Sequence, residues 1–321
     1  MTDRHILGKA GLLAALLASA TVAQAQSPVG LKQGTAPTGP DIVVTAKPDP
    51  TAKETVQQAR AISRMGDFYH DPLARFSEPV CPGVLGLPAD AAGIIVDRIR
   101  YDAERVGAPI EAATPCKANI LIVFTRDGGA EVRKLLKTRG YLFDGIETPE
   151  ARELKEAAGP VRAWNVTQLR NRHGQEQNPT FATMSMSIDS NPGFGPLRVI
   201  NVPTSDSRVF LASRVDITAS VVVIDLGAID GMPVAQIADY AAMRALARTR
   251  PAEGDTAAST ILSLFDPTSA HPREMTAFDL AYLRSLYDAG SNVPASVKLL
   301  NVSRMAAKDK ALAMKDPAPG Q

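Results

Sequence analysis

The sequence has almost no net charge, few cysteines and histidines, and no long apolar run beyond its first residues. Its 321 residues include 35 Lys and Arg against 34 Asp and Glu, with two cysteines and four histidines. A nucleic-acid-binding protein carries a clear excess of positive charge, and a disordered chain is rich in charge and poor in apolar residues. With 45% hydrophobic residues, this chain fits neither class. The composition predicts a folded protein that binds no nucleic acid.

Residues 1–25 have the three parts of a secretory signal peptide. Arg4 and Lys9 give a positive start, an apolar stretch rich in Leu and Ala follows, and residues 23–25 (AQA) form a small-x-small cleavage site. We therefore expect the mature chain to begin at Gln26 and to reside in the periplasm or outside the cell. No later segment offers the roughly 18 consecutive apolar residues of a membrane span, so no transmembrane span is expected after cleavage.

The only two cysteines are Cys81 and Cys116. An exported chain meets an oxidising compartment, where paired thiols persist as disulfides. Their bridge would close a loop over the helix predicted at 89–106 and tie its two ends together. The competing interpretation is a pair of free catalytic thiols, which no Cys-x-x-Cys spacing supports.

Residues 26–53 are rich in Pro, Gly, Thr and Ser and predict a flexible arm. One β-prone run interrupts the arm and consists of Asp41, Ile42, Val43, Val44, Thr45 and Ala46. An extended run of this kind can add to the sheet edge of a partner through main-chain hydrogen bonds. The run also resembles the TonB box near the mature N-terminus of outer-membrane TonB-dependent receptors, which implies TonB or another envelope protein as partner. The alternative is a strand that packs on the chain's own domain.

The segment 54–302 has the pattern of a single α+β domain, and residues 303–321 are predicted to be a disordered tail rich in Lys, Ala and Pro. Apolar residues recur either at helical spacing or in short β-prone runs bounded by glycine and proline. The expected helices cover 54–66, 89–106, 130–138, 148–159, 233–245 and 276–290, and the expected strands cover 119–124, 160–170 and two pieces of 207–226. We expect a mixed sheet packed against several helices, in a protein that acts as a monomer.

Two late segments resemble zincin-type metallopeptidase relatives. In residues 263–289 (SLFDPTSAHPREMTAFDLAYLRSLYDA), a loop with Ser-x-Phe precedes a Thr-capped helix that ends in Leu-Tyr. Residues 221–247 (VVVIDLGAIDGMPVAQIADYAAMRALA) are similar to the strand, loop and helix that place a zincin's metal-binding residues. The resemblance implies a zincin-like fold in an exported bacterial protein.

The zinc ligands of a zincin are not present on this helix. A zincin needs His-Glu-x-x-His, because histidines at i and i+4 share a helix face and the Glu acts on the metal-bound water. At these positions the chain has Gln236, Ile237 and Tyr240. Gln and Tyr are poor zinc ligands and Ile accepts no proton. We therefore expect no metal, no cofactor and no catalytic residue here, as in a pseudo-metallopeptidase.

Four polar residues remain on this helix, namely Gln236, Asp239, Tyr240 and Arg244. The i, i+4 spacing makes Tyr240 a neighbour of both Gln236 and Arg244, with Asp239 beside them. They are the candidate ligand-binding residues, lining an old substrate cleft that would take a peptide or a small ligand. Two other interpretations stay open: a satisfied polar network under the sheet, and the solvent-exposed face of the helix.

Signals for other chemistry are weaker. The three histidines of the mature chain, His70, His173 and His271, lie far apart in loop-like segments, and no Gly-x-Ser-x-Gly motif supports a serine hydrolase. The expected function is that of an exported, non-catalytic binding or accessory protein of the bacterial envelope. The alternatives are a periplasmic hydrolase with a non-standard active site in the same cleft, and a purely structural envelope protein.

Overall fold

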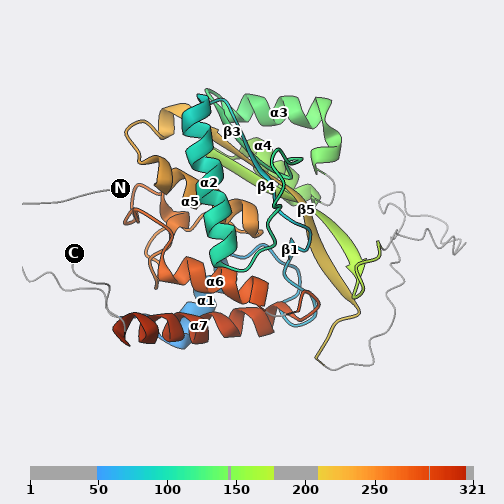
Figure 1. Cartoon of the computed structure of the whole chain (residues 1–321), viewed down its shortest axis with the longest axis vertical. Coiled ribbons are helices and arrows are strands. Elements are labelled where there is room, and N and C mark those ends of the chain that lie inside the picture. The colour runs from blue at the N-terminus through green and yellow to red at the C-terminus, as the bar shows by residue number, and fades with distance from the viewer. Residues whose placement is uncertain (1–48, 144–145, 177–208, 289, 316–321) are drawn as a thin grey trace, which may run out of the picture. The chain divides into compact units, whose positions relative to one another are not determined.

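The computed structural model describes residues 49–143, 146–176, 209–288 and 290–315 (Figure 1). The predicted signal peptide and the β-prone run at 41–46 lie outside the described residues. Among the residues that are described, no helix combines the length and the apolar character needed to cross a membrane.

A mixed sheet forms the centre of the domain. Its strands are β1 (Arg75–Phe76), β2 (Pro82–Leu85), β3 (Ile120–Thr125), β4 (Val161–Asn171) and β5 (Ser213–Asp225). Strand β5 is the hub: β4 runs antiparallel along one of its edges, and β1 and β3 pair with it in parallel on the other. Strand β2 pairs in parallel with β3. The predicted mixed sheet is confirmed, and its pairings are mostly parallel.

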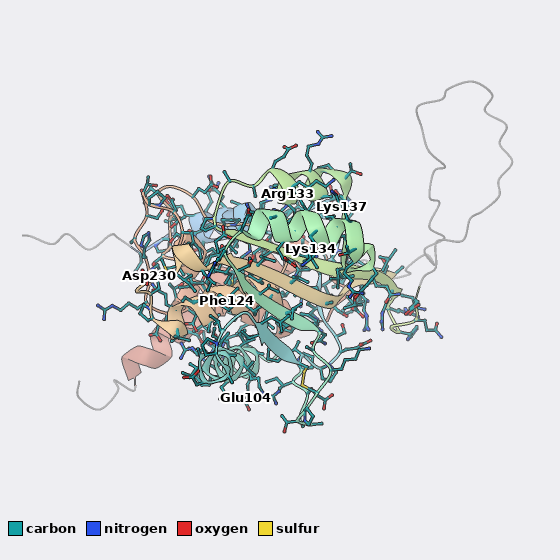
Figure 2. The ribbon with its side chains drawn as sticks, turned by 90° about the horizontal axis from the view of Figure 1, so that it is seen from above. Glu104, Phe124, Arg133, Lys134, Lys137 and Asp230 are labelled. Atoms are coloured by element: carbon teal, nitrogen blue, oxygen red, sulfur yellow. A yellow bond between two sulfur atoms is a disulfide. The ribbon has the colours of Figure 1, made fainter. Side chains whose placement is uncertain are left out.

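Seven α-helices lie in the described part of the chain. They are α1 (Ala52–Ile62), α2 (Ala89–Arg105), α3 (Gly128–Thr138), α4 (Thr148–Glu156), α5 (Val234–Leu246), α6 (Ala277–Asp288) and α7 (Ala295–Lys315). Helices cover both faces of the sheet, and Figure 2 shows α2, which carries Glu104, on the opposite side from α3, which carries Arg133 and Lys137. This arrangement is of the α/β type rather than the segregated α+β type.

The alternation of side chains along β5 explains the two helical layers. Successive residues of a strand point to opposite faces of the sheet. Val222 and Ile224 belong to the large core with α2, α5 and α6, whereas Val221 and Val223 pack with Trp164, α3 and α4. The continuous apolar run at 221–224 is thus buried on both faces.

Strand β5 differs from its expected form. The sequence predicts two strand-like pieces in 207–226, but the structure has one continuous strand over 213–225. Polar Ser220 lies inside this strand, where its hydroxyl donates to Ala245 O over 2.7 Å and accepts from the Asn165 amide over 2.7 Å.

Helix α6 begins with the capping box that the sequence predicts. The backbone N–H of Asp279 donates to Thr276 Oγ1 over 3.2 Å, and the N–H of Thr276 donates to Asp279 Oδ2 over 2.9 Å. The same carboxylate also accepts from Thr260 Oγ1 and from the N–H of Ile261. Burial raises the pKa of Asp279. This one side chain therefore starts α6 and anchors the preceding segment.

Helix α7 continues beyond the expected end of the domain. The sequence predicts a disordered tail from 303, whereas α7 runs to Lys315. Met305 and Ala306 pack against the core, and Arg284 of α6 forms an ion pair with Asp309. Ala, Lys and Met also have high helix propensity. Tertiary contacts and local preference together extend the helix.

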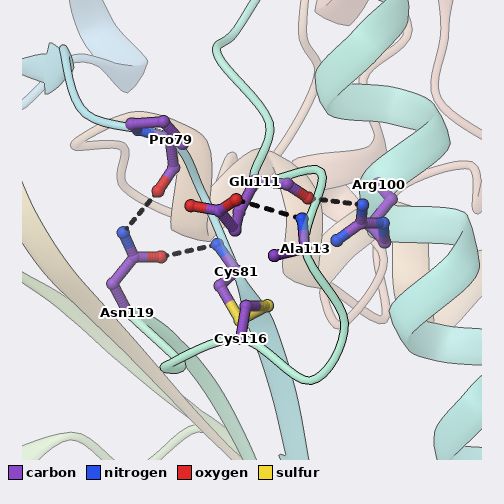
Figure 3. The surroundings of a disulfide bond; sticks show 7 residues. All are labelled: Pro79, Cys81, Arg100, Glu111, Ala113, Cys116 and Asn119. Atoms are coloured by element: carbon purple, nitrogen blue, oxygen red, sulfur yellow. Dashed lines mark hydrogen bonds between the residues drawn. A yellow bond between two sulfur atoms is a disulfide. The ribbon is translucent and has the colours of Figure 1, made fainter.

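The predicted disulfide between Cys81 and Cys116 is present, with the two Cα atoms 6.1 Å apart (Figure 3). It joins the chain just before β2 to the loop before β3, so that α2 lies inside the closed loop. Asn119 supports the junction by accepting from the Cys81 N–H over 2.7 Å and donating to Pro79 O over 2.9 Å. The bridge therefore ties the two ends of the helix segment together.

Replacing both cysteines by alanine is expected to lower the free energy of unfolding by about 3–4 kcal/mol, because the bridge closes a loop of this length in the unfolded chain. Urea unfolding of the Cys81→Ala/Cys116→Ala variant measures the loss. The wild type with reductant is the matched control and should lose a similar amount. A loss below about 1 kcal/mol would contradict the structural role.

Candidate functional site

Helix α5 is the element on which the predicted ligand-binding residues lie. It follows β5 through a turn in which Gly231 adopts a φ of +74°, a conformation that L-residues rarely take. Every residue from Gln236 to Leu246 is buried. A helix that is covered all round is a core helix. The strand, loop and helix expected over 221–247 are therefore present, and α5 is enclosed by the domain.

The four candidate residues are buried, with exposed fractions of 6% for Gln236, 0% for Asp239, 1% for Tyr240 and 3% for Arg244. The interpretation as a solvent-exposed helix face is therefore wrong. It fails because the helix packs on α2 on one side and is covered by the segment 263–275 on another.

Gln236 and Tyr240 both contact the segment 263–275. The Gln236 amide donates to Pro272 O over 2.5 Å. The Tyr240 ring meets Phe265 edge-on, with the ring centroids 4.9 Å apart. One turn further on, Arg244 Nη1 donates to the Tyr240 hydroxyl over 3.1 Å. The structure thus brings Tyr240 and Arg244 together, as the i, i+4 spacing predicts.

Asp239 faces a different set of partners. Its carboxylate accepts two hydrogen bonds from Arg98 of α2, over 2.6 and 2.9 Å, and one from the N–H of Met275 over 2.6 Å. Such bidentate pairing to a guanidinium is the strong form of an ion pair. Asp239 therefore pairs with α2, and it also bonds to the segment 263–275 that Gln236 and Tyr240 contact.

Asp102 of α2 is a residue that the sequence reasoning missed. It is fully buried, and its carboxyl hydrogen-bonds to that of Asp239 when one of the two holds a proton. Arg98 and Arg105 lie at ion-pair distances of 4.0 and 3.6 Å. Burial, followed by the charge of Asp239, raises the pKa of Asp102 to about 7. Two buried carboxyls thus share the interface of α2 and α5, and near neutral pH one of them holds a proton.

A cluster of arginines surrounds the C-terminal end of α5. Arg64 makes a bidentate pair with Glu153 of α4 over 2.9 and 2.6 Å, and Arg248 donates to Glu150 over 2.6 Å. The hydrogen bond from Arg64, followed by its charge, lowers the pKa of Glu153. Buried Arg244 has the Tyr240 hydroxyl as its hydrogen-bond partner and no carboxylate within 4.0 Å among the described residues.

The structure does not bring the three histidines together. His70 hydrogen-bonds to Asp67 in the loop before β1. His173 lies in the turn after β4, and His271 contacts Asp266 O in the loop before α6. Within the described ranges, no group of three His, Cys, Asp or Glu residues has the spacing of a metal site.

Neither family models, nor curated proteins, nor solved structures give a match to this chain.

Changing Asp102 to Asn is expected to remove a pH dependence of stability. The folded protein keeps the proton of Asp102 up to a pH of about 7, whereas the unfolded chain releases it near pH 4. Between these values the free energy of unfolding should fall as pH rises, by up to about 1.4 kcal/mol per pH unit. Urea unfolding across this window measures the slope.

The control for this experiment is Asp97→Asn, which alters an exposed residue on the same helix. Asp97→Asn should keep the wild-type slope, and Asp102→Asn should make it shallower by up to about 1.4 kcal/mol per pH unit, leaving the contribution of other buried carboxyls such as Asp279. If both variants keep the wild-type slope, Asp102 does not hold the proton.

Proposed function

We propose that this chain is an exported, non-catalytic binding or accessory protein of the bacterial envelope, built on a degenerate zincin-like domain. The observation that carries the proposal is the covered face of α5. Gln236 and Tyr240 occupy the positions where a zincin helix has its two histidines, and they contact Pro272 and Phe265 of the chain itself. These residues do not fit a catalytic zinc ion, because Gln and Tyr are poor zinc ligands.

The contact between the two zincin-like segments supports the same proposal. The segments 221–247 and 263–289 are separate in sequence, yet they meet at four points, two of which are the contacts of Gln236 and Tyr240 given above. In addition to these, the N–H of Met275 donates to Asp239, and the Tyr287 hydroxyl donates to Leu246 O over 2.8 Å. Segments that resemble one family and pack on each other form one structural unit.

The predicted signal peptide and arm place this domain in the envelope. The arm would present residues 41–46 as an extended strand to TonB or to another envelope protein. The domain would then be an accessory module that the arm attaches to this partner. This part of the proposal rests on the sequence pattern.

The alternative is a periplasmic hydrolase with a non-standard active site. Its support is the pair Asp102 and Asp239, because a carboxyl with a raised pKa beside an ionised one is typical of acid–base catalysis. Both side chains are fully buried, and Asp239 is fixed by Arg98 and Met275. A substrate would need α2 and α5 to separate, so the non-catalytic function is favoured.

Deleting residues 41–46 from the mature chain is expected to abolish binding to the periplasmic domain of TonB. Isothermal titration calorimetry of the purified proteins measures the affinity. A deletion of residues 30–35, also in the arm, is the matched control and should bind like the wild type. Binding that survives the first deletion would contradict the proposed role of the run.

Metal analysis separates the proposal from zinc-dependent catalysis. Protein purified without chelators and then dialysed against zinc-free buffer is expected to contain far less than one zinc ion per chain. The reason is that Gln236 and Tyr240 replace two of the three zinc-binding side chains of a zincin. One zinc ion per chain, retained after dialysis, would contradict the non-catalytic proposal.

A further inference from the structure

A surface pocket of about 390 Å³ lies at the C-terminal end of α1. Its volume falls in the range of small-molecule sites. The side chains that line it include two arginines and no carboxylate: Gln57, Arg60, Ala61, Ser63, Met65 and Arg250. The pocket combines positive charge with a small apolar surface.

Arg60 and Arg250 have no carboxylate within ion-pair distance among the described residues. The Arg60 guanidinium lies over the ring of Phe68, 4.7 Å from its centroid. The nearby glutamates, Glu150 and Glu153, are instead hydrogen-bonded to Arg248 and Arg64. The two arginines of the pocket thus make no direct ion pair, although the charge of Arg250 contributes to the lowered pKa of Glu153.

The backbone fixes Arg250 beside the end of α1. The N–H of Arg64 donates to Arg248 O over 2.8 Å, and the N–H of Arg250 donates to Ile62 O over 2.7 Å. Between them, Ser63 and Thr249 form an antiparallel bridge. The main-chain bonds therefore hold the backbone at residue 250 beside the end of α1, so that Arg60 and Arg250 line the same pocket.

The wall of the pocket is also fixed. The Ser63 hydroxyl contacts Ala59 O over 2.7 Å and the Tyr282 hydroxyl over 2.8 Å. The acidic residues of the next loop are engaged within that loop, since Asp67 accepts from the N–H groups of Tyr69 and His70, and Asp71 accepts from the N–H of Asp67. These carboxylates do not line the pocket.

We propose that this pocket binds a small organic anion, with its carboxylate or phosphate group between Arg60 and Arg250 and its apolar part over Ala61 and Met65. Guanidinium groups match both anions because their N–H donors form a planar fork. Arg60 and Arg250 would recognise the charge, and the small apolar surface would select for an organic body. This site is separate from the covered face of α5, and the inference depends neither on the zincin-like resemblance nor on the arm.

Calorimetric titration of the mature chain with inorganic phosphate, succinate and the neutral analogue succinamide tests the proposal. Phosphate or succinate, or both, should bind, and succinamide should not. Which of the two anions binds more tightly distinguishes a phosphate ligand from a carboxylate ligand. Raising the salt concentration should weaken binding, because the contact is ionic and solvent-accessible.

The double variant Arg60→Gln/Arg250→Gln should lower the affinity at least tenfold, which corresponds to about 1.4 kcal/mol. Both side chains are exposed, so the variant should fold, with its unfolding midpoint lowered only by the loss of the Arg60 contact with Phe68 and of a cation at the end of α1. Arg273→Gln, which removes an exposed arginine of the loop before α6, is the matched control and should bind normally. The proposal is overturned if neither anion binds, if succinamide binds as well as succinate, or if the double variant retains wild-type affinity.

Discussion

One buried carboxylate, that of Asp239, joins three parts of the domain. It lies on α5, receives both hydrogen bonds of the Arg98 guanidinium from α2, and accepts the N–H of Met275 at the approach to α6. A buried charge is tolerated only when it is paired and hydrogen-bonded, and removing one partner costs about 3–5 kcal/mol. The positions of α2, α5 and the segment 263–275 are therefore mutually dependent.

Asp102 adds a second acidic group to the same interface. Arg98 and Arg105 lie close to Asp102. If both carboxyls were ionised, two negative charges would be buried near each other, which costs free energy. Burial, and after it the charge of Asp239, raises the pKa of Asp102, so that a proton removes one of the two charges. The interface of α2 and α5 thus contains the Arg98–Asp239 ion pair and one protonated carboxyl.

The C-terminal end of α5 collects arginines, for a reason that follows from helix geometry. The C-terminal ends of α1 and α5 meet where residues 62–64 pair with 248–250, and each helix has an arginine in its last turn, Arg60 and Arg244. Cations are stabilised at helix C-termini. Because two such helix ends lie side by side, the arginines there outnumber the two carboxylates that pair with them, those of Glu150 and Glu153.

The sequence predicts those features that depend on local pattern. Helical periodicity and the Thr276 capping box locate α2 and α6, and two cysteines in a chain with a predicted signal peptide predict the bridge. The same local pattern fails for α7, where the sequence predicts no helix and a disordered tail from residue 303, because residues rich in Ala and Lys suit a frayed tail as well as a helix. Only packing against α6 decides between them.

The site depends on contacts between distant parts of the chain, which a local pattern does not contain. Spacing places Tyr240 beside Arg244, as observed. It does not indicate that Asp239 pairs with Arg98, since 141 residues separate the two. Nor does it indicate that the segment 263–275 covers the helix, because that depends on how the chain returns after α5.

The covered face of α5 determines where a ligand can bind. Opening it would break the contacts of Pro272 with Gln236 and of Met275 with Asp239, and the second is a hydrogen bond to a buried charge. A ligand would have to offset that cost before gaining any contact of its own. The pocket at the end of α1 has no such cost, because its two arginines already lie at the surface with a fixed backbone. Recognition in this protein is therefore expected outside the helix that carries the zincin-like pattern.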